Sequence, residues 1–213
     1  MTGPQQQPPP GVEDLPPLTE AERLDQSTAR RSLRARLTGG PVLQAVGRVD
    51  TAGMRQIRGL ARSRRATAVI RSYSHLGEHG AVWVALGVAG VVVDPRPGAR
   101  RRWATGLAGV VAAYLTNTSL KQVARRPRPD FEDLPPLIKT PGPLSFPSSH
   151  SASSAAAVVG YAGLLPTAPL ATLASTMAIS RVHLGVHYPS DVAAGATLGT
   201  LVARGVQRAL RPD

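Results

Sequence analysis

Eight side chains in three short motifs have the types that phosphoryl transfer requires. They comprise three cations, two imidazoles, one carboxylate and two hydroxyl groups: Lys121, Arg128, Arg181, His150, His187, Asp191, Ser148 and Ser149. The motifs are K-x6-R-P from residue 121, P-S-S-H from residue 147 and S-R-x5-H-x3-D from residue 180. Cations bind phosphate oxygens, and an imidazole can attack phosphorus or move a proton. Together the three motifs predict an active site for phosphoryl transfer.

The basic residues predict how such a site would hold its substrate. A phosphate group carries up to two negative charges, which spread over its oxygens during transfer, and Lys121, Arg128 and Arg181 would neutralise them. Backbone N–H groups near Ser149 are expected at a helix N-terminus, which favours anions. We therefore expect the three cations, together with Ser148 and Ser149, to bind phosphate.

The histidines and the aspartate predict the reaction itself. A neutral His187 could attack phosphorus while Asp191 holds its other ring nitrogen and fixes the tautomer. His150 could protonate the leaving oxygen and later activate water. Each residue alone also has an ordinary explanation, as a topology anchor, a helix cap or a structural histidine. Their combination predicts that His187, His150 and Asp191 are catalytic.

Four uncharged apolar runs must position these motifs: residues 80–93, 103–120, 151–178 and 192–203. Crossing a bilayer takes about 20 apolar residues, so the run 151–178 is too long for one ordinary crossing. We expect it to form two short helices that divide at Leu165–Pro166. The runs are rich in small residues, which let membrane helices approach closely. The predicted fold is an all-α integral-membrane bundle of about five to six helices; a soluble helical bundle is the alternative, because several runs are short.

Topology supports a common site for the three motifs. Two crossings separate the second motif from the third, and none separates the first from the second, so all three reach one face of the membrane. We expect a multi-pass protein of the cell membrane. Four arginines in residues 96–102 favour a cytoplasmic position for that loop, with the site outside, whereas the arginine-rich residues before the first run favour the opposite orientation.

The N-terminal third differs from the rest in composition. Residues 1–18 are rich in Pro and Gln and are predicted to be a disordered tail. Residues 19–79 are predicted to form arginine-rich amphipathic helices at the membrane surface, one through residues 19–36 and another over 41–65. An ordinary soluble helix is the alternative, and residues 41–79 could cross the membrane or lie on it. Residues 80–209 are then the transmembrane phosphatase core.

Charge and cysteine content limit the function further. The 213 residues carry a formal net charge of +12 and no cysteine, so disulfides and thiolate zinc sites are excluded. The charge suits an anionic partner: nucleic acid, an anionic membrane or a phosphate substrate. We expect a lipid-linked phosphate substrate and membrane lipids but no nucleic acid, because a basic segment beside a membrane more simply binds anionic lipid. A basic, non-enzymatic protein that binds membranes or nucleic acid is the alternative. No oligomeric state is predicted.

The three motifs, in this order over about residues 80–208, resemble those of the type 2 phosphatidic acid phosphatase superfamily, which includes the vanadium haloperoxidases. The resemblance implies a phosphohistidine on His187, a general acid at His150 and hydrolysis without a metal or cofactor. The usual P-S-G-H motif has Ser149 in place of glycine here. The haloperoxidases are larger and soluble, which disfavours a vanadate-dependent activity.

Three further segments resemble actinobacterial decaprenylphosphoryl-5-phosphoribose phosphatases: residues 74–79, 140–147 and 187–191. This resemblance implies a polyprenyl-linked phosphomonoester substrate in cell-wall precursor synthesis. Polyprenyl diphosphate, phosphatidic acid and phosphatidylglycerophosphate are the alternative substrates.

Two histidine patterns compete with this interpretation. His75, Glu78 and His79 match H-x-x-E-H, which occurs in some zinc proteases, but no third ligand accompanies them. His183 and His187 are four residues apart, a spacing that suits a metal on one helical face. Because Asp191 provides a partner for His187 in the phosphatase interpretation, no metal site is expected.

Overall fold

The structure is a computed structural model, and it describes residues 40–61 and 63–211. The predicted tail over 1–18 and the helix predicted over 19–36 lie outside these residues. The chain divides after Ala45, and the residues from Val46 onward form one compact unit that contains all the contacts described below.

The described residues are helical, without named strands, as the apolar runs predicted. The helices are α2 (Pro41–Leu60), α3 (Arg64–Leu76), the 3-10 helix η1 (Glu78–Gly80), α4 (Ala81–Val93), α5 (Ala99–Ala124), α6 (Ser149–Gly160), α7 (Thr167–His183) and α8 (Pro189–Ala209). Of the seven α-helices in this part of the chain, α4–α8 lie in the predicted core over 80–209, and α2 and α3 lie in the segment 19–79 that was predicted to be amphipathic. The last five, α4–α8, correspond to the four apolar runs, because the run 151–178 forms both α6 and α7.

Helix boundaries follow local sequence signals. The division of the run 151–178 is confirmed: α6 ends at Gly160, and Pro166 is the N-cap of α7. The single helix predicted over 41–65 is divided instead. α2 ends at Leu60, and the side chain of Ser63 accepts a hydrogen bond from Ala66 N to begin α3.

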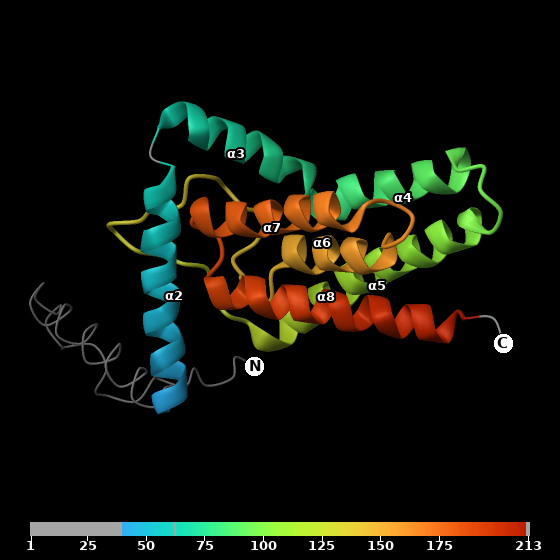
Figure 1. Cartoon of the computed structure of the whole chain (residues 1–213). Coiled ribbons are helices and arrows are strands. Elements are labelled where there is room, and N and C mark those ends of the chain that lie inside the picture. The colour runs from blue at the N-terminus through green and yellow to red at the C-terminus, as the bar shows by residue number, and fades with distance from the viewer. Residues whose placement is uncertain (1–39, 62, 212–213) are drawn as a thin grey trace, which may run out of the picture. The chain divides into compact units, whose positions relative to one another are not determined.

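The four helices α5–α8 are arranged so that one end of the bundle collects the three motifs. Figure 1 shows α5 and α7 ending, and α6 and α8 beginning, at the end of the bundle where the long connection over residues 125–148 lies. The topological prediction of a shared face therefore agrees with the fold.

Small residues allow these helices to pack closely. A Cβ on Gly106 of α5 would lie 2.6 Å from the carbonyl oxygen of Gly160 of α6, and a Cβ on Gly199 of α8 would overlap the backbone of Ala152. Such backbone approaches are typical of membrane helices, where packing rather than the hydrophobic effect drives association.

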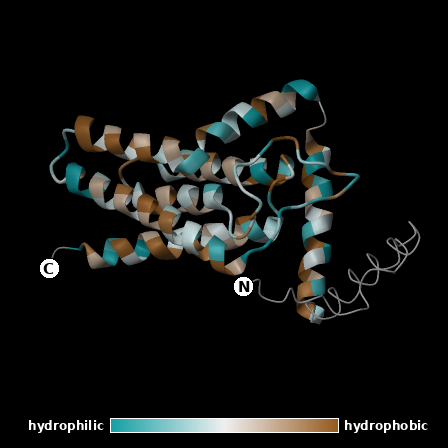
Figure 2. Ribbon diagram, turned by 180° about the vertical axis from the view of Figure 1, so that it is seen from behind, coloured by the Kyte–Doolittle hydropathy of each residue, from teal (hydrophilic) through white to brown (hydrophobic). Residues whose placement is uncertain are grey.

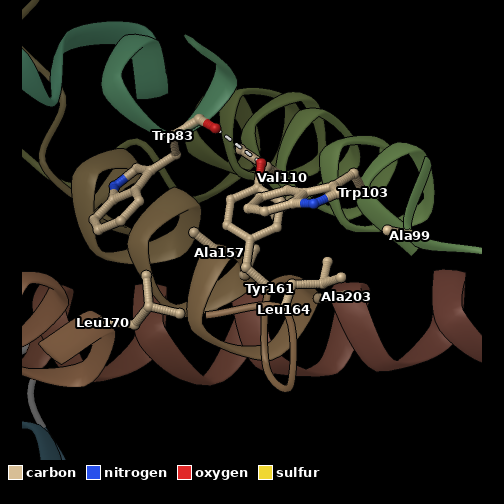
Figure 3. Packing of buried hydrophobic residues seen from close by; sticks show 11 residues of the cluster. Trp83, Ala99, Trp103, Val110, Ala157, Tyr161, Leu164, Leu170 and Ala203 are labelled. Carbon is tan, nitrogen blue, oxygen red and sulfur yellow. Dashed lines mark hydrogen bonds between the residues drawn. The ribbon is translucent and has the colours of Figure 1, made fainter. Parts of the chain in front are cut away.

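An aromatic cluster fills the half of the bundle away from the motifs (Figure 3). The rings of Trp103 and Tyr161 lie 4.9 Å apart between centroids, and Tyr161 Oη donates to the backbone oxygen of Trp83 at 2.8 Å. Trp83 Nε1 in turn donates to Ser154 Oγ at 2.8 Å. The polar atoms of these large side chains are thus paired, which burial requires.

Large apolar side chains also face outward on four of the bundle helices, α4, α5, α7 and α8. Figure 2 shows hydrophobic residues along the bundle helices, and the exposed ones include Val92, Leu115, Leu173 and Leu201. By length and apolarity, none of the described helices could span a membrane singly, but Arg64–Leu76 together with Glu78–Val93, bent by 46°, meets the requirement as a pair.

Candidate active site

Six of the eight predicted site residues line one cavity of about 560 Å³: Lys121, Arg128, Ser149, His150, Arg181 and His187. Glu78 is the one acidic side chain among the described residues that line it. An excess of fixed cations in a partly enclosed space favours an anionic ligand. Asp191 and Ser148 lie behind this wall rather than on it.

The end of α5 and Pro127 direct Arg128 into the cavity. Arg125 ends α5 in the left-handed conformation, at φ 47°, and Pro127 prevents the helix from continuing. The extended chain then pairs with the segment before α6: Arg128 N donates to Pro143 O at 3.2 Å. The guanidinium of Arg128 donates to Gly142 O at 2.8 Å and to Val186 O at 2.7 Å.

The other two cations are also held by the protein while retaining unused donors. Arg181 is 4% exposed, and its Nη1 donates to Ser74 Oγ at 2.6 Å, yet its buried Nε has no hydrogen-bond partner among the described residues. Lys121 Nζ donates to the backbone oxygens of Leu144 and Ser145 at 3.3 and 3.2 Å. Since a buried donor without a partner is costly, the free Nε of Arg181 points to an anionic ligand.

The neighbours of the two ring nitrogens of His187 determine its tautomer. Nε2 lies 3.3 Å from Arg128 Nη1, and arginine can only donate, so Nε2 must carry the lone pair. The proton is then on Nδ1, which lies 3.5 Å from Asp191 Oδ2 and makes no hydrogen bond among the described residues. This places the nucleophilic nitrogen of a neutral imidazole beside a phosphate-binding cation.

The surroundings of His187 favour its neutral form. The side chain is 2% exposed and lies in the connection between α7 and α8. Burial, together with the positive charges of Arg128, Arg181 and Lys121, holds the pKa of His187 well below its usual value of 6.5. Such an imidazole remains unprotonated at neutral pH, as a nucleophile must.

His150 is held from the opposite side by α3. Its Nε2 lies 3.2 Å from Ser74 O, which can only accept, so this nitrogen carries the proton. Nδ1 is then the atom able to accept and return a proton. The ring also packs against Gly77, where an added Cβ would lie 2.8 Å from His150 Cδ2. Ser74 thereby positions both His150 and Arg181, although it belongs to none of the three motifs.

The two serines have separate positions. Ser149 lines the cavity, and its hydroxyl donates to Asn117 Oδ1 at 2.7 Å. Ser148 does not line the cavity; its hydroxyl caps α6 by accepting from Ser151 N at 3.4 Å. The structure thus gives Ser148 a capping contact, and its contact with phosphate stays a prediction.

A buried ion network behind His187 involves two residues without a predicted role. Arg126 Nη1 donates to Asp191 Oδ1 at 2.8 Å, and its Nη2 donates to Asp50 Oδ2 at 2.7 Å. Asp50, 1% exposed on α2, also accepts from Ser190 N and Ser190 Oγ at 2.8 and 2.6 Å. Arg126 lies within the first motif, but Asp50 is 76 residues away and nothing near it in the sequence indicated a site.

The competing histidine patterns have other contacts. His75 Nδ1 pairs with Glu78 Oε1 at 3.0 Å, and His183 Nδ1 lies 3.4 Å from Ile57 O. Within the described part of the chain, no group of three or more His, Cys, Asp or Glu side chains could hold a metal ion.

Comparisons with known proteins identify the family. Residues 103–211 match the model of the PAP2 superfamily. The chain is 42% identical over 137 residues to a decaprenylphosphoryl-5-phosphoribose phosphatase of Mycobacterium tuberculosis, an alignment that covers 63% of this chain and 75% of the relative.

Two solved structures share the fold. The crystal structure of Aquifex aeolicus LpxE has a TM-score of 0.64 at 22% identity and covers 75% of this chain and 94% of that one. That of a transmembrane PAP2 type phosphatidylglycerolphosphate phosphatase from Bacillus subtilis has a TM-score of 0.59 at 24% identity, covering 88% of this chain and 96% of that one. Together with the match over residues 103–211, these similarities establish that the chain belongs to the PAP2 superfamily.

Proposed function

We propose that this chain is a multi-pass membrane phosphatase that removes phosphate from a lipid-linked phosphomonoester through a phosphohistidine on His187. The substrate class we propose is a prenyl-linked sugar phosphate, as in the name of the mycobacterial relatives. The observation that carries the proposal is the placement of a buried His187 Nε2 at 3.3 Å from Arg128, in a cavity that Lys121, Arg181 and His150 also line.

In the first step, the Nε2 lone pair of His187 attacks phosphorus and the P–O bond to the alcohol breaks. For this step His150 carries a second proton, on Nδ1, and gives it to the departing oxygen, so the alcohol leaves neutral. The three cations stabilise the negative charge on the transferring oxygens, and Asp191 stabilises the proton on Nδ1 of His187.

In the second step, His150 accepts a proton from water, which attacks phosphorus and breaks the P–N bond. Inorganic phosphate is released, and both histidines return to their starting protonation states. No step requires a metal ion, since the cations that balance the phosphate are side chains of the chain itself.

The remaining regions have proposed roles relative to this core. Val46 and Val49 are exposed on α2, and the same helix carries arginines, so we propose that residues 19–79 include segments that lie at a membrane surface. Residues 80–209 form the transmembrane phosphatase core in this proposal.

The test is a phosphate-release assay with purified protein in detergent, using prenylphosphoryl-5-phosphoribose, prenyl diphosphate and phosphatidic acid. The first should be preferred, release should persist with EDTA, and vanadate should inhibit because it mimics five-coordinate phosphorus. His187→Ala should abolish release, while His183→Ala, a buried histidine four residues away, should retain it. Loss of release with EDTA, or near-normal turnover by His187→Ala, would overturn the mechanism.

A further inference from the structure

One wall of the cavity is chemically unlike the phosphate site. It is lined by Glu78 and His79 from η1 and by Tyr114, Thr118 and Gln122 from α5. These side chains are uncharged or acidic, whereas the phosphate site on the same cavity contains three cations. A carboxylate repels phosphate but accepts hydrogen bonds from hydroxyl groups, so this wall suits a part of the substrate other than its phosphate.

The geometry of α5 places this wall beside the phosphate site. Tyr114, Thr118 and Lys121 are spaced at i, i+4 and i+7, so they share one face of the helix. At a rise of 1.5 Å per residue, Tyr114 lies about 10 Å from Lys121 along the axis, toward the middle of the bundle. A substrate whose phosphate lies at Lys121 would therefore place its next chemical group along this face.

Two side chains of this wall present polar atoms that make no hydrogen bond among the described residues. The hydroxyl of Tyr114 and the ring nitrogens of His79 make no hydrogen bond within this part of the chain, in contrast to the paired hydroxyls of Tyr73 and Tyr161. The rings of His79 and Tyr114 lie 6.0 Å apart between centroids at 59°. Flat ring surfaces combined with donors and acceptors are well suited to a ligand with both C–H and O–H groups.

The backbone fixes His79 at this position despite strain. His79 has φ 54°, in the left-handed region that non-glycine residues rarely adopt, and Gly80 follows at φ 72°. Gly80 packs on α6, where an added Cβ would lie 3.1 Å from Ser153 Cβ. Four residues before Glu78, Ser74 binds His150 and Arg181. Strained residues held by such contacts cluster at ligand sites.

We propose that Glu78, His79 and Tyr114 form a subsite for the hydroxylated sugar that bears the scissile phosphate, and that they select lipid-linked sugar phosphates over simple lipid phosphates. This inference rests on the proposed phosphatase function. A cavity of about 560 Å³ also has room for far more than a phosphate group. Glu78 Oε1 pairs with His75 Nδ1, so the other oxygen, Oε2, would accept hydroxyl hydrogen bonds, and the two rings would pack on the sugar.

The experiment measures kcat/KM for prenylphosphoryl-5-phosphoribose and for phosphatidic acid, which has no sugar, in the same mixed micelles. Its readout is the ratio of the two values, which is insensitive to a partial loss of folded protein. Glu78→Gln should lower the ratio about tenfold, from loss of a hydrogen bond to a charged group. Part of this change should be faster phosphatidic acid hydrolysis, because a charge that repels phosphate is removed. His79→Ala and Tyr114→Phe should lower the ratio several-fold each.

Tyr73→Phe is the matched control, since it removes a hydroxyl that binds Leu173 O at 2.6 Å and does not line the cavity. Its ratio should equal that of the wild type. Equal effects of the Glu78 and Tyr114 variants on both substrates, or none on either, would overturn the sugar subsite while leaving the phosphatase intact. A wild-type protein that cleaves neither substrate would instead refute the proposed function.

Discussion

Around Tyr161 the helices meet through ring contacts, methyl groups and close backbone approaches, whereas around His187 they meet through buried charges, carbonyl groups and hydroxyls. The first region contains Trp83, Trp103 and Val110, and the second contains Asp50, Arg181 and Asp191, all less than 5% exposed. Apolar burial is favourable in itself, but burying paired charges contributes little net stability. The difference indicates that the polar region is retained for the geometry it imposes on the site.

The residues of the polar region form successive layers, from the cavity outward. The cations and histidines line the cavity, and Ser74 and Asp191 lie directly behind them. Arg126 binds Asp191, and Asp50 binds Arg126. Substitutions should therefore reduce activity most at the cavity and progressively less outward, while those in the aromatic region should lower stability alone.

Arg181 tests the innermost layer and should give the largest effect. Arg181→Ala would lose about two hydrogen bonds to a charged phosphate, each worth about 1.5–3 kcal/mol, so kcat/KM should fall by roughly 10²–10⁴-fold. Arg181→Lys should recover only part of this, because an ammonium group cannot form two parallel bonds. Arg71→Ala, which removes an exposed arginine bound to Leu137 O, is the control. A decrease of less than tenfold for Arg181→Ala would contradict its assignment as a phosphate ligand.

Asp50 tests the outer layer. Asp50→Asn keeps the shape but removes the charge that holds Arg126, so we expect kcat to fall by about tenfold, about 1.4 kcal/mol, with KM little changed. If Asp50 acts through Arg126, adding Asp50→Asn to Arg126→Met should cost no more than about twofold further.

The control for Asp50 is on the same helix. Arg55 forms an exposed ion pair with Asp133 at 3.1 Å, so Arg55→Gln should change neither kcat nor stability appreciably. If Asp50→Asn and Arg55→Gln behaved alike in kcat, the contact of α2 with the site would have no role in positioning.

The low pKa of His187 predicts a pH effect on stability. The unfolded chain takes up a proton below the usual pKa of 6.5 while the folded one does not, so stability should fall as pH decreases from 6.5 toward the lower folded pKa. The limiting slope from this residue is about 1.4 kcal/mol per pH unit. His187→Asn should therefore lose less melting temperature than the wild type between pH 7 and pH 5. Parallel losses in the two proteins would show that His187 is not held neutral by the fold.

Tyr161 tests the aromatic region and should give the smallest effect on function. Tyr161→Phe removes only the hydrogen bond to Trp83 O, so the free energy of unfolding should fall by about 1–2 kcal/mol. The ratio kcat/KM should stay within twofold of the wild type when the protein is folded. A larger loss of activity would mean that the two regions are coupled.

The sequence was most informative where signals were local. The apolar runs and Pro166 predicted five helices, and the three motifs predicted six of the residues that line the cavity. Contacts between distant segments could not be predicted in this way. Ser74 and Asp50 reach the site only through the packing of α3 and α2, and no motif or charge pattern links them to positions 150 or 126. The capping contact of Ser148 likewise depends on the direction of one side chain.

Chemical trapping of the intermediate tests the central mechanism most directly. His150→Ala should be incubated with a ³²P-labelled aryl phosphate, whose good leaving group needs no acid, and then quenched in alkali. Because the base for the second step is missing, a phosphoramidate that is stable in alkali and labile in acid should accumulate on His187, and it should be absent when His187→Asn is added. A chain that turns over substrate yet never carries label at His187 would contradict the account.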